Sequence, residues 1–141
     1  MPGDIALVVG SGAGYAAALI ARIADAVVAL ESDKALAAQS TETLTEQGID
    51  TVAVVSSALA KGYPKQAPYD VIFFNGAVSE VPKAILDQLA EGGRLVAIVA
   101  EPMVGRGIVY VCTGGVISSR HMFDASAPIL PGFEPKPEFV F

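Results

Sequence analysis

An α/β fold around a doubly wound, mostly parallel sheet is the fold class that this sequence predicts, and three observations predict it. Short apolar runs rich in Val and Ile alternate with helical patterns along the first hundred residues. The first of these runs ends in a glycine-rich turn at residues 10–14, and an alanine-rich segment follows. Near the other end, two strand-like runs flank Gly114-Gly115, a hairpin signal. Alternating strands and helices predict a parallel sheet, and the hairpin predicts an antiparallel edge.

The N-terminal half of the chain is expected to alternate three strands with two helices. The strands are predicted at residues 5–9, 26–30 and 51–55. A helix over residues 15–24 is apolar all round and should therefore be buried. A second helix should begin after Asp33, which is a suitable N-cap, and run to about Gln47. Gly48 then supplies a natural end for that helix.

The C-terminal half adds four strands and one more helix to this prediction. The strands are expected at residues 69–74, 94–99, 108–113 and 116–122, with a loop or short helix at 56–68 before them. An amphipathic helix is predicted over residues 81–89, with Pro82 in its first turn. The proline-rich segment after Asp124 ends in an apolar group at residues 139–141, which we expect to be docked.

Composition limits the classes of function. The 141 residues predict one domain, 1–141, and 52% of them are hydrophobic, with a mean hydropathy of +0.53. Glycines or charges interrupt every long apolar run, so we expect no membrane partner. The net charge of −6 argues against a nucleic-acid partner. Cys112 is the only cysteine and indicates a buried thiol in a reducing cytoplasm. His121 is the only histidine, and no metal-ligand cluster is visible.

A nucleoside site is predicted where the first two strands end. Gly10, Gly12 and Gly14 let the chain turn sharply and let a ligand come close to the backbone. Glu31, at the end of the second strand, can accept hydrogen bonds from both hydroxyls of a ribose. A dinucleotide site of the nicotinamide type is disfavoured, because Tyr15 stands where its fingerprint needs a third glycine. A glycine-rich turn without any ligand remains the alternative.

The motifs together resemble those of one enzyme family. Gly-x-Gly-x-Gly followed by an acid after the second strand is the pattern of class I S-adenosylmethionine (SAM) methyltransferases, whose fold is Rossmann-like. The whole chain resembles the C-terminal, cofactor-binding part of protein-L-isoaspartate O-methyltransferases. The segments that carry the resemblance are Gly10–Tyr15, Val28–Glu31, Ala67–Ile72, Gly76–Pro82 and Leu86–Val96.

The resemblance implies a seven-stranded sheet and methyl transfer from SAM to the carboxylate of an isoaspartyl residue in damaged proteins. It implies that SAM is held by the glycine turn, with Gly10, Ser11, Gly12 and Gly14, together with Glu31 and Ser57. Asn75 ends the fourth strand, where this superfamily places groups that face the transferred methyl and the substrate. No catalytic acid or base is identified, because a displacement of this kind needs alignment more than proton transfer.

Three departures from the family pattern support a second hypothesis. The chain lacks the family's N-terminal segment, which carries helices over the sheet and a substrate motif. Val8 stands where the family has an acid that interacts with the amino end of SAM, and Ser57 replaces the acid that holds adenine. The alternative is therefore a non-catalytic, methyltransferase-like binding or interaction module with a degenerate cofactor site. The apolar strands also predict a homodimer, or the exchange of an element between two subunits, that buries the sheet face that those helices would cover.

Overall fold

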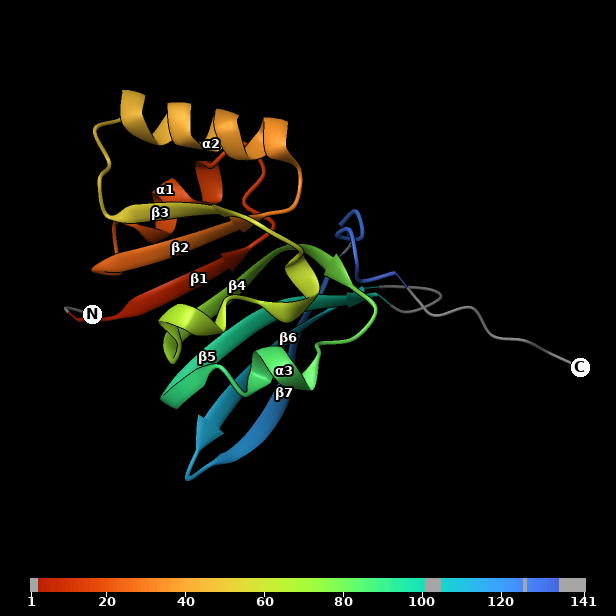
Figure 1. Cartoon of the computed structure of the whole chain (residues 1–141). Coiled ribbons are helices and arrows are strands. Elements are labelled where there is room, and N and C mark those ends of the chain that lie inside the picture. The colour runs from red at the N-terminus through yellow and green to blue at the C-terminus, as the bar shows by residue number, and fades with distance from the viewer. Residues whose placement is uncertain (1–2, 101–104, 126, 135–141) are drawn as a thin grey trace, which may run out of the picture.

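The computed structural model of the chain describes residues 3–100, 105–125 and 127–134, and a seven-stranded sheet forms its centre (Figure 1). The strand order is β3-β2-β1-β4-β5-β6-β7. The strands are β1 Ile5–Val9, β2 Ala26–Glu31, β3 Val52–Ser56, β4 Tyr69–Val78, β5 Leu89–Ala100, β6 Gly105–Thr113 and β7 Val116–Ala125. β1 to β5 run parallel to one another, whereas β6 pairs antiparallel with β5 and β7 pairs antiparallel with β6. The predicted fold class is confirmed.

Apolar side chains cover both faces of the sheet and form two cores. β1 shows the division clearly, because Leu7 and Val9 lie in one core and Ala6 and Val8 lie in the other. The larger core contains residues of the 3₁₀ helix η1 Leu59–Lys61, which follows β3, and of the helix α3 Lys83–Leu86, which follows β4. A second 3₁₀ helix, η2 Pro64–Gln66, lies between η1 and β4 in the chain and contributes no buried residue. The smaller core lies under α1 Tyr15–Ile20, which packs on β1 and β2.

The second helix, α2 Lys34–Glu46, has the bounds that its end signals predict. The Asp33 carboxylate accepts hydrogen bonds from the backbone N–H groups of Ala35 and Leu36, at 2.8 and 3.1 Å. This satisfies two of the donors that a helix leaves free at its N-terminus. Gly48 follows the helix with a φ of 69°, a conformation that favours glycine. The helix packs on β2 and β3.

Two helices are shorter than the sequence predicts. α1 ends at Ile20 rather than at 24, because the N–H groups of Arg22 and Ile23 bond to carbonyls three residues back and tighten the chain into a turn before β2. α3 covers Lys83–Leu86 rather than 81–89. It stops early because the Gln88 carbonyl accepts a bond from Tyr69 N–H at 2.7 Å and so joins the sheet instead of a helix.

The segment after β7 packs back against the end of β4. Ile129 pairs with Ala77 in a short parallel bridge, and Leu130 N–H donates to the Ala77 carbonyl at 2.8 Å. Leu130 and Phe133 are both buried in the larger core. The Phe133 ring meets the Phe74 ring edge-on at 5.4 Å between centroids. The apolar group at residues 139–141 lies outside the described residues, so its predicted docking stays a prediction.

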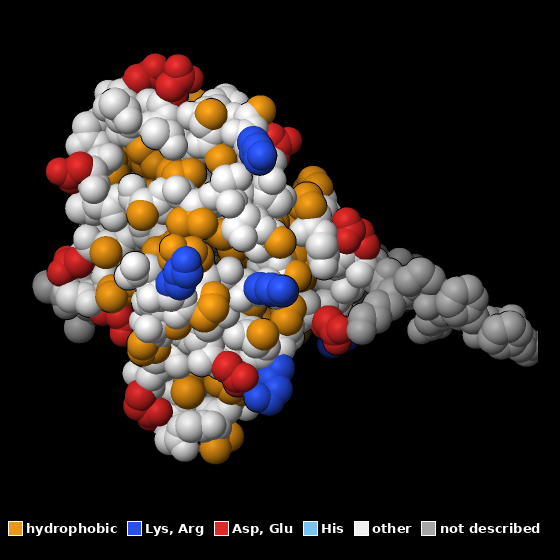
Figure 2. Space-filling model, viewed as in Figure 1, with side chains coloured by type: hydrophobic (Ala, Val, Ile, Leu, Met, Phe, Trp, Pro, Cys, Tyr) orange, Lys and Arg blue, Asp and Glu red, His pale blue; other side chains and the backbone are white. Residues whose placement is uncertain are grey.

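The described surface shows no extended basic patch in the view of Figure 2, where Lys and Arg side chains lie apart from one another. Within the described ranges, no helix has the length and hydropathy needed to cross a membrane. The same part of the chain contains no group of three or more His, Cys, Asp or Glu side chains that could hold a metal ion.

Candidate functional site

Four of the predicted site residues lie at one edge of the sheet, at the carboxyl ends of neighbouring strands. Gly12 follows β1, Glu31 ends β2, Ser57 follows β3 and Asn75 lies late in β4. β1, β2, β3 and β4 are adjacent and parallel, so their ends share this edge. In open α/β sheets, ligands bind outside the carboxyl ends of the strands. The edge is therefore the candidate site.

The three glycines of the turn have different neighbours. All three have positive φ values, 82° at Gly10, 57° at Gly12 and 99° at Gly14. A Cβ at Gly10 would lie 2.6 Å from Leu130 Cδ2, and a Cβ at Gly14 would lie 2.7 Å from Ser40 Oγ. At Gly12 the nearest atom would be Asn75 Nδ2 at 4.0 Å. Gly10 and Gly14 therefore permit close packing, whereas Gly12 borders open space across from Asn75.

Glu31 is the buried charge of the site, with only 5% of its surface exposed. Its Oε1 accepts the Gly12 N–H at 2.8 Å, and its Oε2 accepts the Asp33 N–H at 2.8 Å. The carboxylate thus ties the glycine turn to the start of α2. Each carboxylate oxygen can accept a second hydrogen bond, so capacity remains for two ligand hydroxyls. The position fits the ribose role that was predicted for Glu31.

The two serines of the predicted site face in different directions. Ser11 is 1% exposed, and its hydroxyl lies 3.0 Å from the hydroxyl of Ser40 in α2. Its N–H donates to the Leu30 carbonyl and its carbonyl accepts the Gly14 N–H, so each polar group of Ser11 already has a partner within the chain. Ser57 is exposed, and its N–H donates to the Glu31 carbonyl at 3.0 Å. Its hydroxyl is therefore available beside Glu31.

Asn75 lies between the glycine turn and a cavity of about 420 Å³. Its side-chain N–H donates to the Gly10 carbonyl at 3.1 Å, which fixes the amide beside the turn. Phe73 and Gly76 from β4, Ile98 from β5 and residues 127–131 also line the cavity. Sequence reasoning missed the contribution of residues 127–131. The only signal for it was the prolines at positions 128 and 131, which do not indicate where the segment packs.

The residues fit SAM in part. The open space at Gly12, the buried Glu31 carboxylate and the exposed Ser57 hydroxyl suit a nucleoside with a ribose and an adenine. Val8 is fully buried in the smaller core, so the amino end of the cofactor gains no carboxylate from that position. The site offers fewer charged contacts than the family pattern implies.

Comparison with known proteins identifies the family. The family model for "Protein-L-isoaspartate(D-aspartate) O-methyltransferase (PCMT)" matches residues 1–110. A protein-L-isoaspartate O-methyltransferase of Methanoculleus marisnigri is 43% identical over 94 residues, which are 67% of this chain and 43% of that protein. The enzyme of the same name from Staphylothermus marinus is 40% identical over 74% of this chain and 51% of its own. The chain thus spans about half the length of these relatives.

Solved structures agree with this assignment. A protein-L-isoaspartate O-methyltransferase superposes with a TM-score of 0.86 at 26% identity, over 93% of this chain and 43% of that one. A Plasmodium falciparum protein described as a putative protein-L-isoaspartate O-methyltransferase, in complex with S-adenosyl-L-homocysteine, gives 0.77 at 25% identity, over 92% and 66%. The chain belongs to the protein-L-isoaspartate(D-aspartate) O-methyltransferase family.

Proposed function

We propose that this chain is the cofactor-binding domain of a SAM-dependent methyltransferase that acts on isoaspartyl carboxylates in proteins. The observation that carries the proposal is the grouping of Gly12, Glu31 and Asn75 around open space at the carboxyl edge of the sheet. Family membership and the S-adenosyl-L-homocysteine complex of the Plasmodium falciparum protein support SAM as the cofactor.

Each residue has a binding or positioning role in this proposal. Glu31 accepts the ribose hydroxyls while it holds the Gly12 and Asp33 N–H groups. Gly12 leaves room for the ligand beside the backbone, and Ser57 offers a hydroxyl to adenine. Gly10 and Gly14 let neighbouring residues pack closely against the turn, and Ser11 ties the turn to Ser40 of α2. Asn75, fixed on the Gly10 carbonyl, borders the cavity in which a substrate carboxylate would lie.

Bound SAM supplies an electrophilic methyl group, which moves to a carboxylate oxygen and leaves a methyl ester and the neutral thioether. The protein's task is to align the carboxylate with the methyl and to exclude water, which suits an edge without acid–base residues. Phe73 and Ile98 give the cavity apolar walls for this purpose. Repair of damaged proteins, a cytoplasmic location and a homodimeric state are parts of the same proposal.

Calorimetry with S-adenosylhomocysteine tests the cofactor site directly. We expect saturable binding to the unmodified chain and a loss of about 1.5–3 kcal/mol in binding free energy for Glu31→Ala, because a hydrogen-bonded charge is removed. Glu42→Ala is the matched control, since Glu42 is an exposed glutamate on α2, away from this edge. Glu31→Ala must also retain the far-ultraviolet circular dichroism of the folded chain.

The second candidate function is a non-catalytic interaction module, and the buried Val8 favours it. It predicts no heat with S-adenosylhomocysteine at millimolar concentration, whereas the enzyme hypothesis predicts saturation. If the ligand binds but an isoaspartyl peptide is not methylated, the cofactor role stands and the substrate assignment fails. Equal affinities of the Glu31→Ala and Glu42→Ala variants would remove the role assigned to Glu31.

A further inference from the structure

The cavity that Asn75 borders lies at an irregularity of the sheet. The register of β4 and β5 shifts between Phe73 and Ala77, where β4 has residues 74–76 and β5 has residue 97 alone. A bulge of this kind bends its strand and turns side chains out of the regular ladder. Residues on both sides of the shift line the cavity, and Asn75, in the middle of the bulge, is exposed. The bulge therefore creates the cavity at the carboxyl edge of the sheet.

Residues 127–131 form a further wall of the cavity, and the fold holds this wall in place beside the end of β4 (Figure 1). Ala77 N–H donates to the Pro128 carbonyl at 2.9 Å, and Leu130 N–H donates back to the Ala77 carbonyl at 2.8 Å. Leu130 is buried in the larger core, whereas its neighbour Ile129 is 39% exposed. The buried leucine thus anchors the wall, and Ile129 contributes accessible apolar surface to it.

The cavity is polar at one end and apolar elsewhere. Asn75 has the only polar side chain among the ten described residues that line it, and none of the ten is charged. One N–H of the Asn75 amide donates to the Gly10 carbonyl, and its second N–H can donate to a carboxylate oxygen. Phe73 and Ile98 are only partly buried, and Ile129 is exposed. These three side chains leave apolar surface for a ligand to cover.

A carboxylate alone would leave most of this cavity unfilled. Its three heavy atoms occupy roughly 90 Å³ if each takes the volume of a water molecule, about 30 Å³. The cavity measures about 420 Å³. The remaining space is bounded by apolar side chains, which favour an apolar occupant and disfavour an unpaired charge. Because the proposed substrate is a polypeptide, a side chain beside its isoaspartyl residue is the nearest source of such an occupant.

We propose that the cavity is a specificity subsite that takes a large apolar side chain from a residue flanking the isoaspartyl residue, while Asn75 holds the carboxylate at the polar end. Ile129 is the residue that sets the preference, because it presents accessible apolar surface on the wall. The subsite rejects an acidic neighbour, whose charge would lose water without gaining an ion partner there. This inference rests on the proposed function and adds which polypeptides that site selects.

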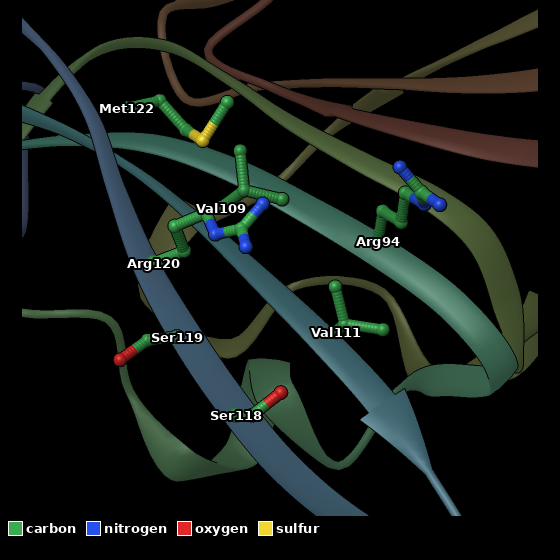
Figure 3. A pocket seen from close by; sticks show the side chains of 7 residues that line it. All are labelled: Arg94, Val109, Val111, Ser118, Ser119, Arg120 and Met122. Atoms are coloured by element: carbon green, nitrogen blue, oxygen red, sulfur yellow. The ribbon is translucent and has the colours of Figure 1, made fainter.

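A second cavity among the described residues provides a matched control. It measures about 390 Å³ and is lined from β5, β6 and β7 by residues that include Arg94, Arg120 and Met122 (Figure 3). None of its lining residues also lines the cavity beside Asn75. Met122 is 53% exposed. Met122→Ser therefore removes an exposed apolar side chain from a different cavity, as Ile129→Ser does from the proposed subsite.

Fluorescence anisotropy with labelled peptides, at saturating S-adenosylhomocysteine, tests the proposal. The peptides carry one isoaspartyl residue between two leucines, two serines or two glutamates, and a fourth carries ordinary aspartate between two leucines. The leucine-flanked isoaspartyl peptide should bind the unmodified chain about tenfold more tightly than the serine-flanked one. Ile129→Ser should remove most of this preference, and Met122→Ser should retain it. Both variants should keep the circular dichroism of the unmodified chain.

A charged variant provides a gain of binding that loss of folding cannot imitate. Ile129→Lys should bind the glutamate-flanked peptide about threefold more tightly than the unmodified chain does, because the new ammonium group supplies the missing ion partner. The same variant should lose the preference for leucine over serine. Absence of this gain would place the flanking side chain outside the subsite and overturn the proposal.

The peptide set separates failure of the subsite from failure of the proposed function. Equal affinities for the leucine-flanked and serine-flanked isoaspartyl peptides would overturn the subsite, as would a preference that survives Ile129→Ser. The proposed substrate class stands in either case if isoaspartyl peptides bind more tightly than the aspartyl one. If isoaspartyl and aspartyl peptides bind alike while the leucine preference depends on Ile129, the subsite stands and the isoaspartyl assignment fails. Absence of binding by every peptide would overturn both.

Discussion

Gly14 is constrained both by its own backbone and by the helix that packs against it. Its φ of 99° is one that side chains rarely adopt, and an added Cβ would lie 2.7 Å from Ser40 Oγ and 3.1 Å from Ser40 Cα. Because the Ser40 backbone cannot move without shifting α2, the clash cannot be relieved by a rotamer change alone. Gly48 also has a positive φ, 69°, but has nothing within 4 Å of its Cβ position.

We therefore expect Gly14→Ala to lower the free energy of unfolding by about 2–4 kcal/mol, from strain and overpacking together. Gly48→Ala should cost only about 1 kcal/mol, from backbone strain alone. Urea denaturation of both variants measures the difference. Equal losses for the two variants would mean that an added Cβ at Gly14 does not collide with Ser40.

Ionisation of the buried Tyr69 should make the folded state less stable at alkaline pH. It is fully buried in the larger core, and its hydroxyl donates to the Tyr63 carbonyl. Burial, and then the nearby Tyr63, raises the pKa of Tyr69 from 10.0 to about 12. A raised pKa means that the folded state favours the neutral phenol. The stability that this provides is fully present below pH 10 and is lost as the pH rises through about 12.

Between pH 9 and pH 12, we expect the free energy of unfolding to fall further in the unmodified chain than in Tyr69→Phe, by about 2 kcal/mol. Tyr15→Phe is the control, because Tyr15 is 64% exposed on α1. Urea titrations at several alkaline pH values provide the measurement. If the unmodified chain and Tyr69→Phe have the same pH dependence, ionisation of Tyr69 does not limit alkaline stability.

Among the secondary-structure elements, local sequence signals predict where helices begin and where the chain turns better than where helices end. The Asp33 cap, Gly48 and Gly114-Gly115 act through nearest neighbours, and each is found where it was predicted. α3 ends early because Gln88 is bound to β4 through a backbone bond and to Lys61 through its side chain. Those partners are distant in sequence, so no periodicity within residues 81–89 reveals them.

Residues 127–133, which follow β7, pack against the candidate site. Leu130 is 9% exposed and fills the space that a side chain at Gly10 or Gly76 would occupy. Its N–H also bonds to the Ala77 carbonyl. The segment therefore supports both the glycine turn and the end of β4 beside Asn75.

We expect Leu130→Ala to lower the free energy of unfolding by about 2–4 kcal/mol, since it leaves a cavity under Gly10. It should also weaken S-adenosylhomocysteine binding, because the turn loses its support. Ile129→Ala is the neighbouring control and should cost less than about 1 kcal/mol, since Ile129 is 39% exposed. Differential scanning fluorimetry with and without ligand separates the two effects. A Leu130→Ala chain with normal stability would show that the tail is not part of the core.

For the whole molecule, the sequence predicted which strand ends meet at the candidate site but not which way their side chains point. Glu31 and Asn75 lie at the predicted edge, because the end of a strand in a parallel sheet follows from topology alone. The Ser11 side chain faces α2 instead. Its contact with Ser40 depends on how helices pack, which the local sequence does not predict. The wall at residues 127–131 depends on a tail that returns to β4 over fifty residues later. Long-range packing of this kind leaves no local pattern.

Successive residues of β1 alternate between the two cores, and this alternation predicts how the chain unfolds. Leu7 belongs to the larger core and Val8 to the smaller one, yet they are adjacent in one strand. Loss of either core would expose one face of an apolar strand, so neither core should persist alone. We therefore expect a single domain, 1–141, that unfolds in one cooperative transition.

Circular dichroism at 222 nm and tyrosine fluorescence should give coincident urea transitions for the unmodified chain. Leu7→Ala and Val8→Ala should shift both signals together, although their side chains lie on opposite faces. Leu7→Ala should cost about 2–5 kcal/mol and Val8→Ala less, because a smaller side chain leaves a smaller cavity. Two separate transitions, or a variant that moves one signal alone, would divide the chain into independent units. Coincidence is the expected result because β1 lies between β2 and β4 and pairs with both, so both halves of the sheet depend on it.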